Sequence, residues 1–387
     1  MGFIMALPPS KNGLINYIKR LKILSEIDNF KSFIFTDTEK AYPIKGFKII
    51  YVRDGFLFSF KLVFLALKFK VRVLDIQYIY GQYGKNNRWS LGYLISGYSI
   101  ISLLVLCRFF RIRSVLTMHS VINDLSKESV LTEMKRYSYL NGLIKLFNRL
   151  VILLSNSIVV LSDQQYAFLK DYTGRSKLHV VHHGIDSLNL EPEPHASFTF
   201  SYIGMIRPNK GVLNLLNAFQ KLSEKYNNVE LIILGGLGDS SFQEYENYFN
   251  AVKSKIKELQ SNCNINFREG WVEERDILDA LKRTDALVFP YVDNANEVSG
   301  VAFSYASAGI PYICSDIPRF NSSFSNNENA LLVKCGSSIE LFTAMEKLMK
   351  DPKLIAKISE NLKAMWEKYN WEENAKAYYR IYRSLLK

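Results

Sequence analysis

Apolar and polar positions follow two alternating periods along the first half of the chain. Short apolar runs are separated by longer stretches in which apolar residues recur every three or four positions, which is the period of an amphipathic helix. Strands separated by helices predict parallel sheets joined by right-handed crossovers. The strands predicted in this half span residues 1–7, 32–35, 47–52, 73–78, 114–118, 157–161 and 178–182.

The pattern stops at residues 187–197, where two prolines and two glutamates break both periods. Such a segment is typical of an interdomain linker. The alternation then resumes, so we expect two α/β domains, residues 1–190 and 191–370, and a terminal helical segment over residues 371–387. The strands of the second half are predicted at residues 198–203, 229–234, 264–267, 286–289, 312–314 and 330–333. Its helices are predicted at residues 211–225, 242–260, 274–282, 301–308, 338–349, 354–365 and 372–386.

One stretch of the first half, residues 91–107, is nearly free of charge and is followed by Arg108, Arg111 and Arg113. Its seventeen residues are at the short limit for a membrane-spanning helix, and its glycines, serines and tyrosines argue against one. The strand that follows favours a crossover helix, buried or lying on the surface. A basic, aromatic-rich helix in the interface of a bilayer is the alternative.

The net charge of +12 lies in the first half of the chain. Residues 1–190 contain 26 Lys and Arg against 12 Asp and Glu, whereas the remainder contains 23 against 25. This asymmetry indicates an anionic partner for the first half, such as a membrane surface or a lipid phosphate. A solvated basic surface is the alternative. Nucleic acid is not expected, because no nucleic-acid-binding motif is present and the basic residues are spread along the chain.

Cysteine usage indicates a reducing, cytoplasmic location without a metal centre. No C-x-x-C pair is formed, and no histidine stands at metal-ligand spacing near the cysteines. The N-terminus lacks a charged segment followed by an apolar core and a cleavage site, so no secretory signal is expected. The cysteines are Cys107, Cys263, Cys314 and Cys335.

A basic turn follows the first strand of the second half. Arg207 and Lys210 stand three residues apart in the segment 204–211, between a predicted strand and a predicted helix. Two cations beside the N–H groups of a helix start suit a pyrophosphate. A capped loop with solvated cations is the alternative.

A polar loop after the strand at residues 286–289 carries Glu297 directly before a helix start. A carboxylate accepts hydrogen bonds from sugar hydroxyls. N–H groups at the helix start, here Ser299, Gly300 and Val301, suit phosphate. A simple first-turn cap is the alternative role of Glu297.

Two sites in the first half are candidates on weaker grounds. Asn12 and Gly13 follow the first strand and have the form of half a glycine-rich phosphate turn. His119 follows the strand at residues 114–118, where parallel sheets place ligands, although a lone histidine is as often structural. The segment 235–238 lacks the last glycine of G-x-G-x-x-G, so no dinucleotide site is expected.

In this order, the segments resemble the retaining GT-B glycosyltransferases of the large family that includes bacterial phosphatidylinositol mannosyltransferases and many polysaccharide and lipopolysaccharide enzymes. The resemblance covers nearly the whole chain. It implies two Rossmann-like domains facing across a cleft and a helix from Trp371 that crosses back onto the first domain. It rests on residues 8–13, 117–120, 180–186, 204–211, 285–290 and 297–311.

The resemblance also implies how the donor phosphates are bound. Arg207 and Lys210 would hold the pyrophosphate, and the turn at Asn12 and Gly13 would approach it from the first domain. Further backbone donors to phosphate would come from Ser299, Gly300 and Val301.

For the sugar and the nucleoside, the resemblance implies that Glu297 binds hydroxyls of the transferred sugar, that His119 lines the sugar site and that Val272 lies near the base. The family's usual second Glu, which binds the ribose, is replaced by Tyr305. We therefore expect the ribose to be held in another way or more weakly. Arg207 is also a substitute, because the family's phosphate-binding Arg often directly follows the first glycine of its motif.

We therefore expect a cytoplasmic hexosyltransferase, peripheral on the membrane, that acts in surface glycan or polysaccharide synthesis. It would move a sugar from a UDP- or GDP-linked donor to a saccharide or lipid-linked acceptor, with retention and without a metal or other cofactor. Two alternatives have the same architecture. One is a catalytically silent scaffold or partner subunit, suggested by Tyr305, and the other is a UDP-sugar epimerase, which acts without an acceptor.

Overall fold

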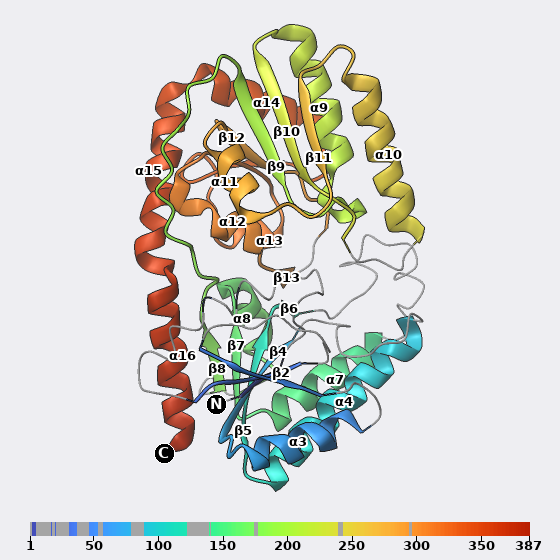
Figure 1. The fold of residues 1–387 in the computed structure, drawn as a ribbon, viewed down its shortest axis with the longest axis vertical. Helices are drawn as coiled ribbons and strands as arrows, with labels where there is room; N and C mark the ends of the chain where they lie inside the picture. The colour runs from blue at the N-terminus through green and yellow to red at the C-terminus, as the bar shows by residue number, and fades with distance from the viewer. Residues whose placement is uncertain are drawn as a thin grey trace.

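Two parallel sheets, one in each half of the chain, form the framework of the molecule (Figure 1). The first sheet has seven strands in the described residues, in the order β3-β2-β1-β4-β5-β7-β8. Its strands are β1 (Gly2–Ile4), β2 (Phe33–Thr36), β3 (Lys48–Tyr51), β4 (Val73–Tyr78), β5 (Arg113–Met118), β7 (Ser157–Val160) and β8 (Leu178–Val180). The computed structural model describes residues 2–4, 17, 20, 31–36, 46–52, 57–78, 89–121, 139, 141–173, 177–238, 243–293 and 296–387.

The second sheet has six strands in the described residues, in the order β11-β10-β9-β12-β14-β15. In both sheets the chain order reverses beside a central strand, which is the doubly wound arrangement that places ligands at the carboxyl ends of the strands. The strands are β9 (Phe198–Ile203), β10 (Val229–Gly235), β11 (Ile265–Glu269), β12 (Ala286–Phe289), β14 (Tyr312–Ser315) and β15 (Leu331–Val333).

Helices surround the two sheets. Those of the first half are α3 (Phe58–Lys68), α4 (Trp89–Phe109), α7 (Asn141–Leu154) and α8 (Asp163–Leu169). Those of the second half are η3 (Pro208–Lys210), α9 (Val212–Lys225), α10 (Gln243–Leu259), α11 (Glu274–Leu281), α12 (Gly300–Ser304), η4 (Ala306–Ala308), α13 (Pro318–Asn321), α14 (Ser338–Lys350), α15 (Pro352–Tyr369) and α16 (Trp371–Leu386). None of the described helices, α4 included, is both long and apolar enough to cross a membrane.

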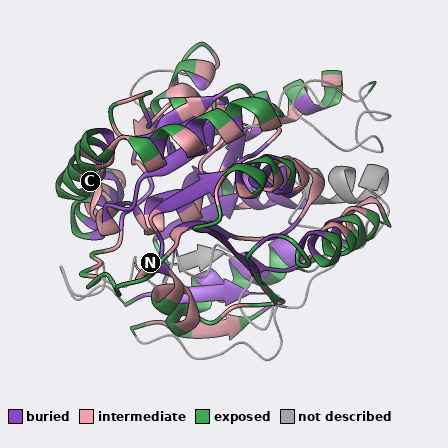
Figure 2. Ribbon diagram, turned by 90° about the horizontal axis from the view of Figure 1, so that it is seen from above, coloured by how far each residue is buried: buried purple, intermediate pink, exposed green. Residues whose placement is uncertain are grey.

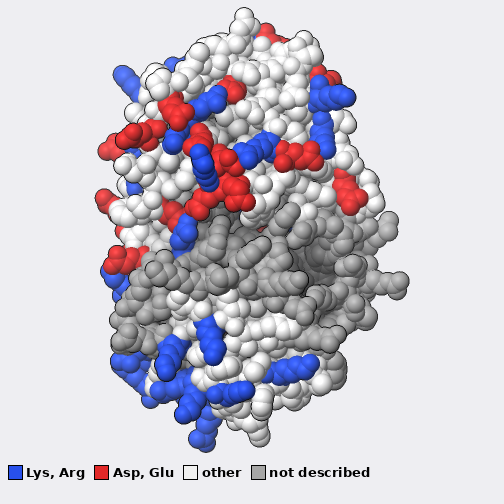
Figure 3. All heavy atoms as spheres, viewed as in Figure 1, with Lys and Arg blue, Asp and Glu red and all other residues white. Residues whose placement is uncertain are grey.

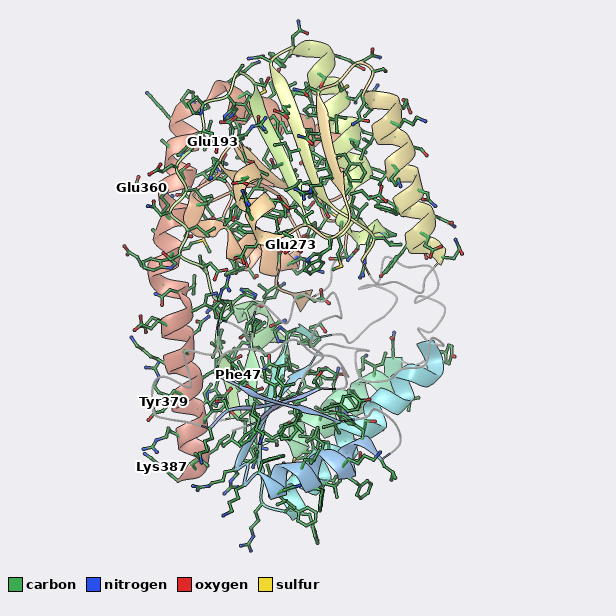
Figure 4. All side chains as sticks on the ribbon, in the orientation of Figure 1. Phe47, Glu193, Glu273, Glu360, Tyr379 and Lys387 are labelled. Atoms are coloured by element: carbon green, nitrogen blue, oxygen red, sulfur yellow. The ribbon has the colours of Figure 1, made fainter. Side chains whose placement is uncertain are left out.

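Side chains of the first sheet alternate between two cores. In β4, Leu74 and Ile76 belong to a core shared with α3, α4 and α7, whereas Val73 belongs to a core shared with α16. This alternation follows from the pleat of a strand and buries the parallel sheet on both faces. Figure 2 shows buried strands between helices with exposed outer faces. Phe47 and Tyr379, labelled in Figure 4, lie at the partly buried margin of the α16 core.

The chain returns from the second half to the first through α15 and α16. The last helix, α16, contacts β4 and β5, and where the chain crosses, Ile185 forms an isolated bridge with Asn370. A Cβ on Gly184 would lie 2.2 Å from the Trp371 ring, so the crossing requires glycine there. The expected fold, two Rossmann-like domains with a C-terminal helix that crosses back onto the first, is confirmed.

The helix predicted over residues 301–308 was wrong. The structure has two short pieces, α12 and η4, which meet at Tyr305. The Tyr312 hydroxyl donates to the carbonyl of Ala302 at 2.7 Å, and this is the acceptor that Ala306 N–H would use in a continuous helix. A side chain from the neighbouring strand therefore competes with the helix.

Candidate active site

A short antiparallel contact joins the two halves beside two candidate residues. β6 (Ser120–Val121) directly follows His119, and β13 (Asn296–Glu297) pairs with it, with Glu297 opposite Ser120. Residues opposite each other in such a pair have Cα atoms about 4.5–5.5 Å apart. The polar loop of the second half therefore lies directly against the loop that follows β5.

The Glu297 carboxylate is held by Arg319 of α13, a residue to which the sequence pattern gave no role. Arg319 is 4% exposed. Its Nη1 donates to Glu297 Oε2 at 2.8 Å, and its Nη2 donates to both carboxylate oxygens of Asp293 at 3.1 and 3.0 Å. Burial acts to lower the pKa of Arg319, but the carboxylates of Asp293 and Glu297 outweigh burial and raise it. Within the described residues Glu297 Oε1 accepts no hydrogen bond, so that oxygen can accept one from a ligand.

Arg207 and Lys210 lie in the turn between β9 and α9, and both contact aromatic rings. The Arg207 guanidinium lies 5.0 Å from the centre of the Tyr245 ring, and its Nε donates to the carbonyl of Leu237 at 3.2 Å. Lys210 Nζ lies 3.8 Å from the centre of the Tyr291 ring. Such contacts are cation–π interactions. They restrain the positions of the two cationic side chains within this turn.

The pKa of Lys210 is lowered to about 7. Burial is the main cause and the charge of Arg319 is the next, while Asp293 and Glu297 act in the opposite direction. The amine is therefore close to half protonated at neutral pH. An anion placed beside it would favour the charged form and raise the pKa again.

The basic turn is fixed to the loop that follows β12. Val292 N–H donates to the carbonyl of Asn209 at 3.0 Å, and Asn209 Nδ2 donates to Asp293 Oδ2 at 2.7 Å. Gly211 has φ +65°, and a Cβ there would lie 1.8 Å from the carbonyl oxygen of Pro290. Only glycine therefore allows this approach.

The start of α12 faces a neutral histidine. Ser299 Oγ accepts a hydrogen bond from Ala302 N–H at 3.4 Å. His183 Nδ1 donates to the carbonyl of Gly184 at 2.9 Å, and burial lowers the pKa of His183 to about 4. Its Nε2, which carries the lone pair, lies 3.3 Å from the position that a Cβ on Gly300 would occupy.

His119 is also neutral near pH 7. Its Nε2 donates to Gln77 Oε1 at 2.8 Å, and its ring meets the Tyr17 ring edge-on, with the centroids 4.9 Å apart. Burial, followed by the charge of His183, lowers the pKa of His119 to about 3. His119 therefore presents its Nδ1 as a hydrogen-bond acceptor.

A buried carboxyl group lies behind His119. Asp75 Oδ1 accepts from Thr117 Oγ1 at 2.8 Å, and its Oδ2 accepts from the Tyr382 hydroxyl of α16. A second tyrosine of α16, Tyr378, exchanges a hydrogen bond with Tyr17 at 2.8 Å. Burial raises the pKa of Asp75 to about 7. These bonds connect the C-terminal helix to the ring that supports His119.

Tyr305 lies near an ion cluster that links the two halves. Arg20 Nη2 lies 3.1 Å from Asp186 Oδ2 and 3.5 Å from Glu274 Oε1. Burial raises the pKa of Tyr305, and the nearby carboxylates of Glu274 and Asp186 raise it further. Val272, just before α11, is packed against the core of the second half.

The structure brings Arg207, Lys210 and Glu297 together, whereas Asn12 and Gly13 lie outside the described residues. Ser299, Gly300 and Val301 begin α12, on the same loop as Glu297. The position of Arg319, shortly after the end of β14, could have identified it. Polar residues that follow the carboxyl ends of parallel strands are candidates for ligand binding, and His119 after β5 was chosen on the same ground. Among the described residues, no group of His, Cys, Asp or Glu is placed to hold a metal ion.

Residues 189–365 match the family model described as Glycosyl transferases group 1. No curated protein is significantly similar to the chain in sequence. Sucrose-phosphate synthase from Thermosynechococcus elongatus is similar in structure, with a TM-score of 0.79 and 15% identity, over 100% of this chain and 98% of that one.

Two further solved structures share the fold. HepE from Anabaena, solved in complex with UDP, has a TM-score of 0.72 and 14% identity over 99% of each chain. WaaG, a glycosyltransferase involved in lipopolysaccharide biosynthesis, has a TM-score of 0.65 and 14% identity over 98% of each chain. At such identities the likeness establishes the GT-B fold.

Proposed function

We propose that this chain, which has the GT-B fold and whose residues 189–365 match the Glycosyl transferases group 1 model, is a glycosyltransferase. It would move a sugar from a UDP- or GDP-linked donor to a saccharide or lipid-linked acceptor in surface glycan synthesis, with retention. One observation carries the proposal. The Tyr291 ring lies 3.8 Å from Lys210 Nζ and 5.6 Å from the Arg319 guanidinium that holds Glu297. Cations suited to a diphosphate therefore adjoin a carboxylate suited to sugar hydroxyls.

The reaction requires stabilisation of the negative charge that develops on the leaving group. The bond between the anomeric carbon and the phosphate oxygen breaks, and its electron pair leaves with the nucleoside diphosphate. The acceptor hydroxyl bonds to the anomeric carbon, and its proton passes to the departing phosphate. Arg207 and Lys210 would stabilise the growing negative charge. Losing one such contact typically costs about 2.7–4 kcal/mol of barrier.

Glu297 and His119 would position the sugar. Because Arg319 binds only Oε2 of Glu297, Oε1 would accept from a sugar hydroxyl. His119 would line the same site from the first half, since β6 and β13 pair beside it. Donor phosphate contacts from Ser299, Gly300 and Val301 and from Asn12 and Gly13, and a base contact at Val272, belong to the same proposal.

The acceptor proposal draws on the charge of the first half. Its excess of Lys and Arg suits an acceptor carried on an anionic lipid at the cytoplasmic face of a membrane. HepE and WaaG share the fold. The UDP complex of HepE and the role of WaaG in lipopolysaccharide biosynthesis are compatible with a nucleotide-sugar donor and a glycan acceptor.

A thermal-shift screen against UDP, GDP, ADP and their sugar conjugates tests the donor site. A ligand at a hundredfold excess over its Kd stabilises the folded state by about 2.7 kcal/mol, so one nucleotide class should raise the Tm. Lys210→Ala should abolish that rise. Lys253→Ala, which removes an exposed lysine paired with Glu269, should leave it unchanged.

Tyr305 supports a second candidate, a catalytically silent scaffold. No rise in Tm with any nucleotide would favour it over the transferase. If a nucleotide binds, product analysis with and without acceptor separates the remaining possibilities. Conversion of UDP-sugar without acceptor would indicate an epimerase, and the anomeric configuration of a transferred sugar tests retention.

A further inference from the structure

The outer surface of α3, α4 and α7 is unusually apolar. Ten of the fifteen large apolar side chains that are exposed among the described residues lie on these helices or directly beside them. Phe64 is 67% exposed, Phe109 is 78% exposed and Leu153 is 64% exposed. We call this set the apolar face: Leu57, Phe60, Phe64, Leu67, Val105, Phe109, Phe110, Leu143, Leu146 and Leu153.

Helical spacing gathers these side chains into stripes. The exposed residues Leu57, which caps α3, and Phe60, Phe64 and Leu67 within it recur every three or four positions, so they share one side of the helix. The opposite side, with Leu62 for example, is buried in the core. A surface helix of a globular protein normally turns a polar side outward, whereas the outward side of α3 carries these Phe and Leu side chains beside the exposed Lys61 and Lys68.

The three helices form one continuous layer. α4 contacts both α3 and α7, and Figure 1 shows them together on one side of the first sheet. Arg108 Nη1 donates to the carbonyl of Leu153 at 2.9 Å, which ties the end of α4 to the end of α7. The Phe109 and Phe110 rings pack edge-on beside this contact, with the centroids 5.0 Å apart.

The charges described around the apolar face have one sign. In the described parts of residues 46–162 the only acidic residue is Asp75, and it is buried. The described basic residues of the same range are all exposed, and Figure 3 shows basic and no acidic side chains along the lower margin of the molecule. They are Lys48, Lys61, Lys68, Lys70, Arg72, Arg108, Arg111, Arg113, Lys145 and Arg149.

We infer that the apolar face docks on an anionic lipid bilayer, with its Phe and Leu side chains in the headgroup region and its Lys and Arg side chains on lipid phosphates. Charge complementarity selects this occupant. A second copy of the chain would bring two basic surfaces together, which costs free energy. The inference rests on the lipid-linked acceptor of the proposed function, because docking would bring the first half to a membrane-bound acceptor.

Co-sedimentation with vesicles tests the inference on the full chain. Binding is expected to vesicles of phosphatidylcholine mixed with phosphatidylglycerol and to weaken as salt is raised. The double variant F60S/F64S should bind at least about tenfold more weakly, a loss of about 1.4 kcal/mol, because two Phe side chains no longer leave water on binding. Ile339→Ser, which removes a residue of the second half that is 64% exposed, should bind as the unchanged chain does.

A charge variant and a donor readout separate the outcomes. Lys61→Glu with Lys68→Glu should weaken binding to anionic vesicles, and the nucleotide-dependent rise in Tm should persist in every one of these variants. No sedimentation at low salt, or sedimentation that F60S/F64S does not alter, would overturn the inference. Self-association that F60S/F64S abolishes would show instead that a second copy covers the face. If no nucleotide raises the Tm of the unchanged chain, that result would count against the proposed function and not against docking on the membrane.

Discussion

The surroundings of Lys210 keep its amine from being fully protonated near pH 7. Its side chain is removed from water and lies near Arg319, and together these lower its pKa to about 7 from an ordinary 10.5. A diphosphate beside Nζ would reverse this balance. The protonation of this amine would therefore be linked to binding of the proposed donor.

Donor binding should take up a proton above pH 7. The free amine is neutral there and the bound amine is charged, so the affinity should fall as pH rises, by up to about tenfold per pH unit. Below pH 7 the amine is already charged and this dependence disappears. Isothermal titration in buffers of different ionisation enthalpy, with a nucleotide sugar as ligand, measures the uptake.

Lys210→Arg is the matched control for this linkage, since a guanidinium stays charged throughout. It should bind the donor without proton uptake. An affinity of the unchanged chain that is the same at pH 7 and pH 9 would contradict the role given to Lys210.

At the residue scale, the sequence predicted candidates more readily than their partners. Arg207, Lys210 and Glu297 follow strands or begin helices, and that local position is visible in the pattern. Arg319 was not predicted to have a role, because its importance depends on two carboxylates brought to it by a different loop. Only tertiary packing shows that Glu297 and Asp293 share one guanidinium.

At the element scale, the turn between β9 and α9 depends on one glycine. Gly211→Ala would force a side chain into φ +65° and towards the carbonyl of Pro290. We expect a loss of about 1–3 kcal/mol of stability from the backbone alone, and loss of the nucleotide-dependent rise in Tm. Urea unfolding and the thermal-shift screen measure the two effects.

Gly142→Ala provides the comparison, because a Cβ at Gly142 in α7 would meet nothing within 4 Å. It should keep or raise stability, by about 0.5–1 kcal/mol. Equal behaviour of the two variants would show that the turn tolerates a side chain and does not fix Lys210.

Elements with a clear period were predicted well from the sequence. β4, β9 and β12 have the predicted bounds, since apolar runs bounded by polar residues leave little choice. The helix over residues 301–308 failed because the Tyr312 hydroxyl competes for a carbonyl within it. No local pattern predicts such a bond from a neighbouring strand.

At the scale of the whole molecule, α16 is attached to the first sheet through a buried carboxyl group. The pKa of Asp75 is raised from an ordinary 3.8 to about 7, so the folded state keeps the proton over a range in which the unfolded state loses it. Stability should therefore fall as pH rises from about 4 to 7 and level off above pH 7. This shift in the pKa of Asp75 corresponds to a loss of at most about 4 kcal/mol in the free energy of unfolding.

Asp75→Asn should remove this dependence while keeping an acceptor for Thr117. Its stability relative to the unchanged chain should increase between pH 4 and pH 8, as measured by urea unfolding at each pH. A constant difference between the two proteins over that range would mean that Asp75 is already ionised in the folded chain.

The two sheets and the returning helix were predictable from alternation, linker composition and resemblance together. The contact between β6 and β13 was not, because each strand has two residues and no period of its own. The sequence also did not show which candidate residues lie close together, since His119 and Glu297 come from different halves of the chain.

The chain crosses between its halves at two points that lie side by side. Ile185 N–H donates to the carbonyl of Tyr369 at 2.8 Å next to the bridge with Asn370, so the outgoing and returning strands of the chain share one pivot. The pairing of Ser120 with Glu297 is a further contact between the halves. It is close to this crossing, because Tyr17 contacts both His119 and Trp371, with ring centroids 4.9 and 5.0 Å apart. A rotation of one half about this crossing would change how the loop after β5 meets the loop that carries Glu297, so we expect the proposed positioning of the sugar to depend on the angle between the halves.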